Sequence, residues 1–434
     1  MCAKSRASRR KFLRLAVGAG VLTWPKLSAI SATDQSTADD VPVSGIEHPA
    51  LASFDKLMVD FVRYEHAVGA ALAVTKDGRL VYARGFGLAD RDQKEPVQPN
   101  SLFRIASLSK VVTAAAILQL AGHKKLALTD KVCQILDLRE TMDERWPQVT
   151  IGQLLHHTGG WDRDKSFDPM FRSIKIAKEV GGQPPAMPAD IIRYMTRQPL
   201  DFDPGERYAY SNFGYSLLGR VIERVSGADY GQVVRSKVLA PLGIRRMKLG
   251  VTLVGGRAEH EVRYYDAKNR TGKAVMGPVG EQVPLPYGAW CLEAMDAHGG
   301  WIASAVDMVR FAAAFDSPSR CRILSADGVG TMFERPADAA GHDAQGKPKD
   351  VYYACGWNVR RAGKDGRNTW HTGSLDGTST LLVRRTDGLD WAVMFNCRDG
   401  AGGKQMAGAI DPLVHKAADA VADWPRVDHF NKWL

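Results

Sequence analysis

The chain has 434 residues, of which 45% are hydrophobic, so it can bury a large core in one big domain or two joined ones. The formal net charge is +10, which by itself would suggest an acidic partner such as nucleic acid. Seven Lys and Arg residues and no Asp or Glu lie within residues 1–32, however, so subtracting these seven leaves +3 for the remainder. A net charge of +3 is ordinary for a chain of this length, so the composition does not indicate nucleic-acid binding as the function.

The basic segment at the start has the pattern of an export signal. Ser8–Arg14 reads SRRKFLR and resembles the twin-arginine signature, and the apolar stretch Leu15–Leu22 that follows is too short to span a bilayer. We expect residues 1–32 to be a twin-arginine signal peptide that directs the protein to the periplasm or otherwise out of the cytoplasm. No other long apolar segment follows, so no integral membrane span is expected.

The cysteines do not form a metal-binding pattern. There are six, and Cys2 would leave with the signal peptide. The other five are scattered and contain no C-x-x-C, so one or two disulfides are possible in an oxidising compartment but no pairing follows. We expect neither a zinc site nor any other metal or cofactor.

In chain order, the first elements are a linker, a hairpin and a helix. Residues 33–47 are polar and read as a flexible linker before a domain spanning 48–424. Two strand-like runs flank Asp77-Gly78, a two-residue hairpin signal. The segment FRIASLSKVVTAAAILQLAG at 103–122 then predicts a helix that is apolar nearly all round, opened by Ser107.

The rest of the chain is first helical and then returns to strands. Helical patterns predominate from about 130 to 295; in one of them an apolar face spans residues 217–225, and Gly227 is a plausible stop. Strand-like runs then flank a turn at 386–388, and residues 425–434 read as a solvated tail. The pattern predicts an α/β (α+β) fold. An antiparallel sheet would be built from both ends of the chain and flanked by helices, with a largely helical inserted subdomain at about 130–295.

One S-x-x-K motif stands out by its context. Ser107 and Lys110 lie one turn apart on the same face of the predicted buried helix, whereas the second copy, Ser53 and Lys56, lies on an amphipathic segment where lysine is solvated. Ser107 could simply be an N-cap, but Glu rather than Lys is favoured three residues after such a cap. Burial and the helix dipole both lower the pKa of Lys110, which makes it a usable proton acceptor for a serine hydroxyl.

Acyl transfer also needs a proton route to the leaving group and donors for the oxyanion. Tyr210-Ser211-Asn212 forms the chain's only Y-x-N, and His371-Thr372-Gly373-Ser374 forms a Gly-containing edge that leads into a strand-like run. Either stretch could supply these groups.

Taken in order, Ser107-x-x-Lys110, Tyr210-x-Asn212 and His371-Thr372-Gly373 resemble the three motifs of the serine penicillin-recognising superfamily. The nearest branch holds class C β-lactamases, DD-carboxypeptidases, D-aminopeptidases and esterases. The stretches LLHHTGGW, YSNFGYSLLGRVIERVSG and GGWIASAVDMVRFAAAF are also similar to this family, and the resemblance covers about residues 48–400.

The resemblance implies a role for each matching residue. Ser107 corresponds to the acylated nucleophile, Lys110 to the amine that takes its proton, and Tyr210 to the phenol that passes a proton to the leaving group and helps to activate water. Asn212 would bind the substrate amide and Thr372 its carboxylate or carbonyl. His371 and Gly373 belong to the same wall of the cleft, and the backbone N–H groups of Ser107 and Ser374 would form the oxyanion hole.

Two departures from the family pattern bear on the substrate. β-Lactamases of this branch usually carry Lys where this chain has His371, and a neutral imidazole is a weaker anchor for an anion. His298 and Trp301 stand where relatives have smaller residues, so they either narrow the pocket or, as we favour, pack.

Other motifs carry less weight. A second H-T-G at 157–159 precedes the Y-x-N motif and lacks a following strand, so we expect a structural loop there. No G-x-S-x-G elbow occurs, which argues against an α/β-hydrolase.

The sequence thus predicts an exported serine hydrolase that acts through an acyl-enzyme on amide or ester bonds of a small molecule or short peptide. It would resemble DD-carboxypeptidases, D-aminopeptidases or β-lactamases. Two alternatives stay open at this point: a carboxylesterase of the same fold, and a penicillin-binding-like scaffold module without turnover.

Overall fold

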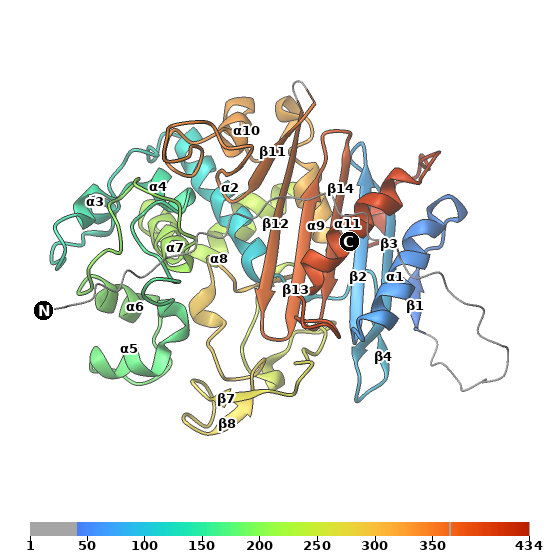
Figure 1. Cartoon of the computed structure of the whole chain (residues 1–434), viewed down its shortest axis with the longest axis horizontal. Coiled ribbons are helices and arrows are strands. Elements are labelled where there is room, and N and C mark those ends of the chain that lie inside the picture. Colours follow the sequence, from blue (N-terminus) through green and yellow to red (C-terminus); the bar gives the residue numbers. More distant parts are fainter. Residues whose placement is uncertain (1–40, 364–365, 434) are drawn as a thin grey trace, which may run out of the picture. The chain divides into compact units, whose positions relative to one another are not determined.

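A nine-stranded antiparallel sheet forms the centre of the part of the chain that the computed structural model describes, residues 41–363 and 366–433. Eight of its strands follow the order β1-β3-β2-β14-β13-β12-β11-β10, and β4 pairs with the end of β3. Their bounds are β1 (Val43–Gly45), β2 (Gly69–Lys76), β3 (Arg79–Asp90), β4 (Glu95–Pro96), β10 (Val351–Tyr353), β11 (Asn358–Ala362), β12 (Gly366–Leu375), β13 (Thr378–Arg384) and β14 (Leu389–Phe395). Because β2 pairs with β14, both ends of the chain build one sheet, as the sequence predicts (Figure 1).

The hairpin predicted at Asp77-Gly78 is present. Lys76 pairs with Arg79 across the turn, and the two turn residues have φ of 52° and 72°. Positive φ at both central residues matches the right-handed twist of the flanking strands, which is why Asp-Gly is a good hairpin signal. The predicted turn at 386–388 is likewise confirmed, because it joins the paired strands β13 and β14.

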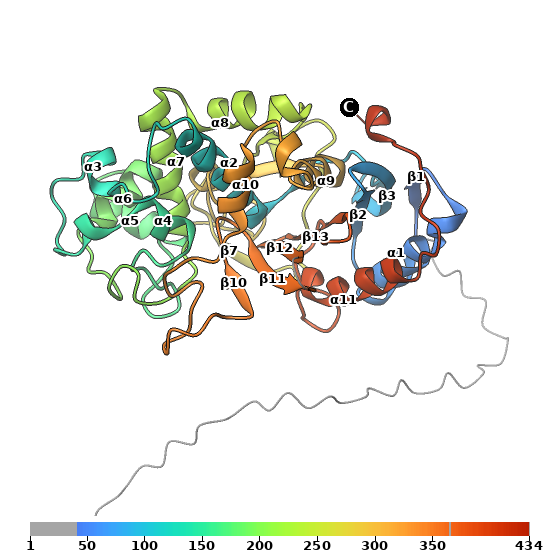
Figure 2. The ribbon, with the colours of Figure 1, turned by 90° about the horizontal axis from the view of Figure 1, so that it is seen from above.

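Helices cover both faces of this sheet. On one face lie α1 (Ala52–Tyr64) and α11 (Met406–Asp419), and on the other α9 (Ala305–Ala313), as Figure 2 shows. Alternate residues of β2 reach the two cores: Leu72 packs with the first pair of helices, and Ala71 with the larger core on the opposite face. Strands buried on both faces are largely apolar, and β2 is apolar from Gly69 to Val74.

The larger core continues into a helical region beside the sheet (Figure 1). It contains α2 (Ser109–Gly122), α3 (Val132–Leu136), α4 (Ile151–Leu155), α5 (Ser173–Glu179), α6 (Pro188–Met195), α7 (Asn212–Ser226), α8 (Tyr230–Val233) and α10 (Ala326–Phe333). The predicted helix before Gly227 is confirmed as α7. Leu217, Leu218, Val221 and Ile222 are buried on it, and Gly227 ends it in a left-handed conformation.

The helical pattern ends earlier than the sequence predicts. Residues 248–284 contain short strands instead: β6 (Lys248–Leu249), β7 (Thr271–Lys273) and β8 (Gln282–Pro284). The first of these pairs with β9 (Trp301–Ala303), which also pairs with β5 (Phe103–Arg104). Pro278, Pro284 and Pro286 interrupt any helix at the end of this region, because proline lacks the donor N–H and clashes with the preceding turn.

The sequence predicts a domain of residues 48–424, but segments on both sides of this range contact the main sheet. Val43–Gly45, which we assigned to a linker, forms β1 against β3, and the supposed solvated tail packs on the sheet. There the backbone N–H of His429 donates to the carbonyl of Leu80 at 2.9 Å, and Asp428 accepts from the N–H of Leu80 at 3.2 Å. A short polar segment and a tail give no periodic signal, so pairing of this kind is visible only in three dimensions.

Three further sequence predictions concern the cysteines, a membrane-spanning helix and the signal peptide. The five cysteines of the described chain are all free. No helix in the described ranges is long and apolar enough to cross a membrane. The predicted signal peptide lies outside the described residues.

Candidate active site

Ser107 lies in a 3₁₀ turn, Ala106–Leu108, between β5 and α2. The α-helix itself begins at Ser109 with Leu108 as its N-cap, so Ser107 stands just ahead of the helix and its side chain does not cap it. Ala106, immediately before the serine, has φ of 48°, a left-handed conformation that is costly for a residue with a side chain. Backbone strain of this kind tends to persist at functional sites.

Strand β12 is held directly against this turn. A Cβ on Gly373 would collide with the carbonyl oxygen of Ile105 and with the hydroxyl of Thr380, so only glycine allows this approach. The Thr380 hydroxyl in turn donates to the carbonyl of Ile105 at 3.0 Å, and that of Thr378 to the carbonyl of Arg104 at 3.0 Å. The third motif therefore reaches the serine through backbone packing.

Lys110 is fully buried and its amine contacts three oxygen atoms. Its Nζ lies 3.1 Å from Ser107 Oγ, 2.7 Å from Asn212 Oδ1 and 2.9 Å from the carbonyl oxygen of His298. Two of these, the amide and the carbonyl oxygen, can only accept. In its neutral form the amine has two N–H donors, which these two acceptors occupy, so its lone pair is left for the Ser107 hydroxyl.

The surroundings favour that neutral form. Burial holds the pKa of Lys110 well below its ordinary value, Asp168 acts to raise it, and Arg163 acts to lower it. Desolvation disfavours the ammonium, so the arrangement prepares an amine that can accept a proton. The exposed Lys56 of the other S-x-x-K motif pairs with Asp60 at 2.8 Å, as expected for a solvated lysine.

Asn212 is oriented by a carboxylate that the sequence did not reveal. Its Nδ2 donates to Asp168 Oδ2 at 2.6 Å, and this contact turns its Oδ1 toward Lys110. Asp168 caps the short turn Pro169–Phe171 with its other oxygen. Burial raises the pKa of Asp168, and the Asn212 hydrogen bond acts to lower it.

Two basic side chains lie close to the ring of Tyr210. Lys110 Nζ is 4.8 Å from the centre of its ring, and the guanidinium of Arg163, on an exposed loop, is 4.9 Å away. Burial raises the pKa of the phenol, while a hydrogen bond with Ser107 acts to lower it. A protonated phenol in contact with the serine is suited to donate a proton rather than to remove one.

His371 is buried and uncharged. Its Nδ1 lies 2.6 Å from the carbonyl oxygen of Thr372, which can only accept, so this nitrogen carries the proton. Its Nε2 then accepts from the Tyr353 hydroxyl at 3.0 Å. Burial, with a smaller effect from the nearby Lys110, lowers the pKa of His371 to about 3, so the ring carries no charge at neutral pH.

The structure thus brings the three predicted motifs together. Ser107, Lys110, Tyr210 and Asn212 are joined by the contacts above, and β12 lies alongside with Thr372 exposed and Ser374 partly exposed. Among the described residues, no group of His, Cys, Asp or Glu side chains is arranged to hold a metal ion. The assembled groups are those of nucleophilic acyl transfer: a hydroxyl, an amine with a lone pair, a phenol and a strand edge.

The family model that matches this chain is Beta-lactamase, over residues 54–414. This chain belongs to the Beta-lactamase family. A putative fimbrial assembly protein, FimD of serogroup D from Dichelobacter nodosus, is 28% identical over 62% of this chain. The match spans 63% of that relative's length, so the chain covers less than two thirds of it.

Two other relatives widen the comparison. Esterase EstB from Burkholderia gladioli is 30% identical over 68% of this chain and 75% of its own. The crystal structure of D-amino acid amidase from Ochrobactrum anthropi SV3 complexed with L-phenylalanine has a TM-score of 0.65. It is 23% identical over 85% of this chain and 98% of its own, which shows a shared fold. The predicted family resemblance and the α/β fold with its antiparallel sheet are both confirmed.

Within this family fold, His157 has a closer relation to the site than we expected. Its loop is structural, but its ring lies 4.3 Å from that of Tyr210, and its Nδ1 accepts from the N–H of Ser211 at 3.2 Å. The ring therefore backs the tyrosine and fixes the start of α7. Trp301 packs as favoured, donating to the Tyr230 hydroxyl, and His298 meets the site through its backbone alone.

The sequence missed four residues that contact the candidate site in this structure: Asp168, Arg163, His157 and Tyr353. Two sequence signals could have drawn attention to them: the Asp-Pro pair at 168–169, typical of a cap, and the H-T-G at 157–159. Nothing local indicated that either segment lies beside Tyr210.

Proposed function

We propose that this protein is an exported serine hydrolase that cleaves amide or ester bonds through an acyl-enzyme on Ser107. The observation that carries the proposal is the buried amine of Lys110, 3.1 Å from Ser107 Oγ, with its other two contacts taken by obligate acceptors. A base within hydrogen-bond reach of a hydroxyl is the minimum for activating a serine.

The reaction would run in two halves. Ser107 Oγ attacks the carbonyl carbon while its proton passes to Lys110, and backbone N–H groups of Ser107 and Ser374 stabilise the oxyanion. Tyr210 gives its proton to the leaving amine or alcohol, which breaks the scissile bond and leaves the acyl group on the serine. Water then attacks the ester with the same groups acting in reverse.

The neutral His371 bears on the choice of substrate. A lysine at this position would place a second cation on the strand edge, whereas His371 has a lowered pKa and both ring nitrogens occupied. A site without that cation favours neutral acyl donors, which supports a carboxylesterase as the second candidate beside DD-carboxypeptidase, D-aminopeptidase or β-lactamase activity. Export rests on the basic leader of the sequence.

The test is covalent labelling of the purified protein, read by intact mass, with a fluorescent β-lactam and a fluorophosphonate, alongside Ser107→Ala. Labelling of the wild type by both probes supports a peptidase-like or β-lactamase-like site, and labelling by the fluorophosphonate alone supports the esterase. Relative rates on p-nitrophenyl esters and D-alanyl peptides then rank the substrates. If neither probe labels the wild type, or Ser107→Ala is labelled equally, the proposal fails and the scaffold-module alternative gains support.

A further inference from the structure

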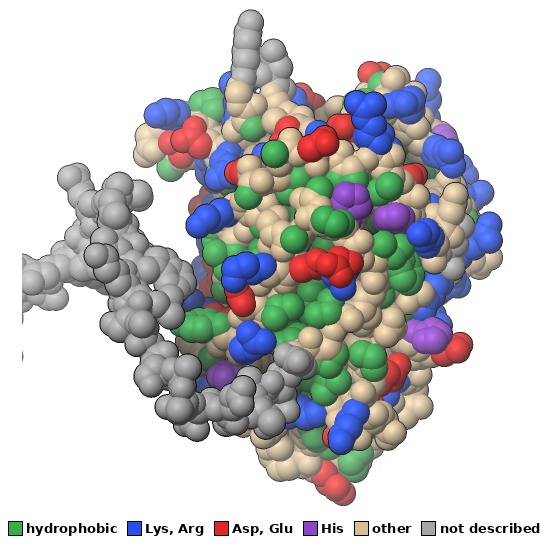
Figure 3. All heavy atoms as spheres, turned by 90° about the vertical axis from the view of Figure 1, so that its right-hand side faces the viewer, with side chains coloured by type: hydrophobic (Ala, Val, Ile, Leu, Met, Phe, Trp, Pro, Cys, Tyr) green, Lys and Arg blue, Asp and Glu red, His purple; other side chains and the backbone are tan. Residues whose placement is uncertain are grey.

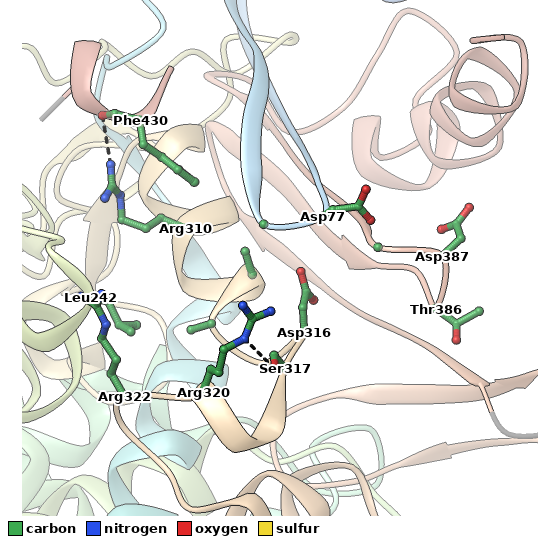
Figure 4. A pocket seen from close by; sticks show the side chains of 14 residues that line it. Asp77, Leu242, Arg310, Asp316, Ser317, Arg320, Arg322, Thr386, Asp387 and Phe430 are labelled. Atoms are coloured by element: carbon green, nitrogen blue, oxygen red, sulfur yellow. Dashed lines mark hydrogen bonds between the residues drawn. The ribbon is translucent and has the colours of Figure 1, made fainter. Parts of the chain in front are cut away.

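Four hollows lie around the turns at Asp77-Gly78 and Thr386–Gly388 and around Gly366, the first two beside α9 and the fourth beside α11. The first, of about 820 Å³, lies between the turns at Asp77-Gly78 and Thr386–Gly388 and the segment after α9 (Figure 4). The second, about 420 Å³, shares Asp316 with the first; the third, about 500 Å³, shares Arg367 with the second. A fourth, also about 500 Å³, shares Arg385 with the second. We call these four hollows, each of which shares lining residues with another, the hairpin groove.

Arginine dominates the lining of the hairpin groove. Nine arginines and five acidic residues line the four hollows within the described chain. The arginines are Arg310, Arg320, Arg322, Arg335, Arg360, Arg361, Arg367, Arg384 and Arg385, and the acidic residues are Asp77, Asp316, Glu334, Asp387 and Asp419. No residue of the three catalytic motifs lines any of the hollows.

Most of the acidic residues have a cationic partner. Asp316 pairs with Arg384 at 2.9 Å, and Asp387 and Asp419 share Arg385, each at 2.6 Å. The carboxylate of Asp77 pairs with a lysine. Because one guanidinium cannot neutralise two carboxylates, the Arg385 cluster keeps one negative charge, and Glu334 has no basic partner within 4.0 Å among the described residues. Two uncompensated negative charges therefore remain in the groove.

The other seven arginines have no carboxylate within 4.0 Å among the described residues. Those with a close partner contact neutral groups. Arg310 donates to the carbonyl of Phe430 at 3.0 Å and stacks on its ring at 4.1 Å, and Arg367 donates to the carbonyl of Phe333 at 3.2 Å. Such contacts hold the guanidinium in place without cancelling its charge. Figure 4 shows Arg310, Arg320 and Arg322 on the side of the first hollow opposite Asp77 and Asp387.

We propose that the hairpin groove binds a flexible chain of repeated anionic groups, an acidic polysaccharide. The uncompensated arginines are spread over four neighbouring hollows, which suits a polymer better than one small anion. A flexible chain can bend around the hairpin ends from one hollow to the next, which the flat surface of a bilayer cannot do. The face around α1 and β1 has basic and acidic side chains interspersed among apolar ones, so the excess is a local feature (Figure 3).

The groove has a direct structural connection to the active site. Strand β12 begins in the groove at Gly366 and carries His371–Ser374 near its other end. At about 3.3 Å per residue, Arg367 and Thr372 lie roughly 17 Å apart along the strand. A polysaccharide held in the groove would therefore keep the enzyme close to substrates attached to, or mixed with, that polymer.

The test measures binding of the purified protein to fluorescent polygalacturonate, which carries carboxylates, and to dextran sulfate, with neutral dextran as the blank. Binding to at least one acidic polymer is expected, weakening at least tenfold between 50 and 200 mM NaCl as counterions are released. Arg320→Gln/Arg322→Gln and Arg361→Gln/Arg367→Gln should each weaken it at least tenfold. The matched pair Lys56→Gln/Lys178→Gln removes the same charge from exposed helix positions outside the groove and should change affinity less than twofold.

Three results would overturn the proposal: no binding to either acidic polymer, equal losses in the matched pair, or groove-dependent binding only to phosphatidylglycerol-containing vesicles or single-stranded DNA. Hydrolysis of p-nitrophenyl acetate should be unchanged in all these variants, because none of the substituted residues lies in the catalytic motifs. The readout is binding, so this test stands whether or not the esters are hydrolysed.

Discussion

Lys110 is the residue whose chemistry can be isolated most cleanly, because another basic side chain can replace it without being able to accept a proton. In Lys110→Arg the neutral amine gives way to a guanidinium, which does not lose its proton and so cannot accept one. We expect kcat/KM for p-nitrophenyl acetate to fall by about 10²- to 10⁴-fold, the usual contribution of a general base.

The second S-x-x-K motif supplies the control for that variant. Lys56→Arg makes the same change at an exposed residue paired with Asp60, and it should leave the rate within twofold of wild type. A Lys110→Arg enzyme that retained full activity would show that Ser107 is activated by another group.

Asp168 tests the electrostatics of the amine, because it acts to raise the pKa of Lys110 against the effect of burial. The active form is the neutral amine, so kcat/KM rises with pH through the pKa of Lys110. Asp168→Asn removes the carboxylate, lowers that pKa further, and should move the acid limb of the kcat/KM profile to lower pH.

The measurement for Asp168→Asn is kcat/KM for p-nitrophenyl acetate at closely spaced values from pH 5 to 10. Glu179→Gln, an exposed substitution on α5, should leave the limb in place. A shift of the limb to higher pH in Asp168→Asn would contradict the assignment of Lys110 as the base.

At this residue scale the sequence indicated chemistry but not geometry. Ser107, Lys110, Tyr210 and His371 were identifiable because each belongs to a short motif of fixed spacing. Asp168 and Tyr353 were not, because each acts on a motif residue distant in the chain: Asp168 orients Asn212, and Tyr353 donates to His371. A single sequence contains no signal for such contacts.

Among the elements, the close packing of β12 on the turn before α2 depends on one glycine. In Gly373→Ala the new Cβ would collide with backbone at Ile105, so the strand must move away from Ser107. We expect the free energy of unfolding to fall by about 1–3 kcal/mol, typical of overpacking, and kcat/KM to fall with it. Urea denaturation and p-nitrophenyl acetate hydrolysis measure the two effects.

Gly408→Ala is the matched control for this substitution. Gly408 is exposed on α11, and a Cβ added there meets open space. The substitution should therefore raise the free energy of unfolding by about 0.5–1 kcal/mol through helix propensity. A stable and fully active Gly373→Ala would show that β12 need not approach Ser107 so closely.

Elements were predictable where a local rule specified them. The two hairpins followed from turn residues, and α7 followed from its apolar period and Gly227. The start of α2 was wrong by two residues, because the strained turn at Ala106 is imposed by packing against β12. The prediction of helix at 248–284 was wrong, because the spacing of apolar residues in this region imitates a helical face.

Over the whole molecule, the sheet depends on contacts between segments more than 300 residues apart. Composition and strand signals at both ends predicted that such a sheet exists, but the pairing of β2 with β14 required the structure. Burying these strands against helices on both faces also traps polar groups that strand patterns alone do not flag, and Asp390 is one of them.

Asp390 joins the two ends of the chain at a cost that depends on pH. Its Oδ2 accepts from the Thr75 hydroxyl at 2.9 Å, while its Oδ1 is buried without a hydrogen bond among the described residues. Burial, with Asp316 nearby, raises its pKa well above the ordinary value, while Arg384 acts to lower it. An acid with a raised pKa binds more protons in the folded state, so it lowers stability as pH rises above about 4, its unfolded pKa.

Asp390→Asn keeps the shape and the acceptor for Thr75 but cannot ionise, so it removes that pH dependence. We therefore expect the Tm of the variant minus that of wild type to be more positive at pH 7.5 than at pH 4.5. The exposed substitution Asp60→Asn should show no such trend. If the difference in Tm were constant or reversed between the two pH values, Asp390 would be ionised in the folded protein, with Arg384 compensating for its burial.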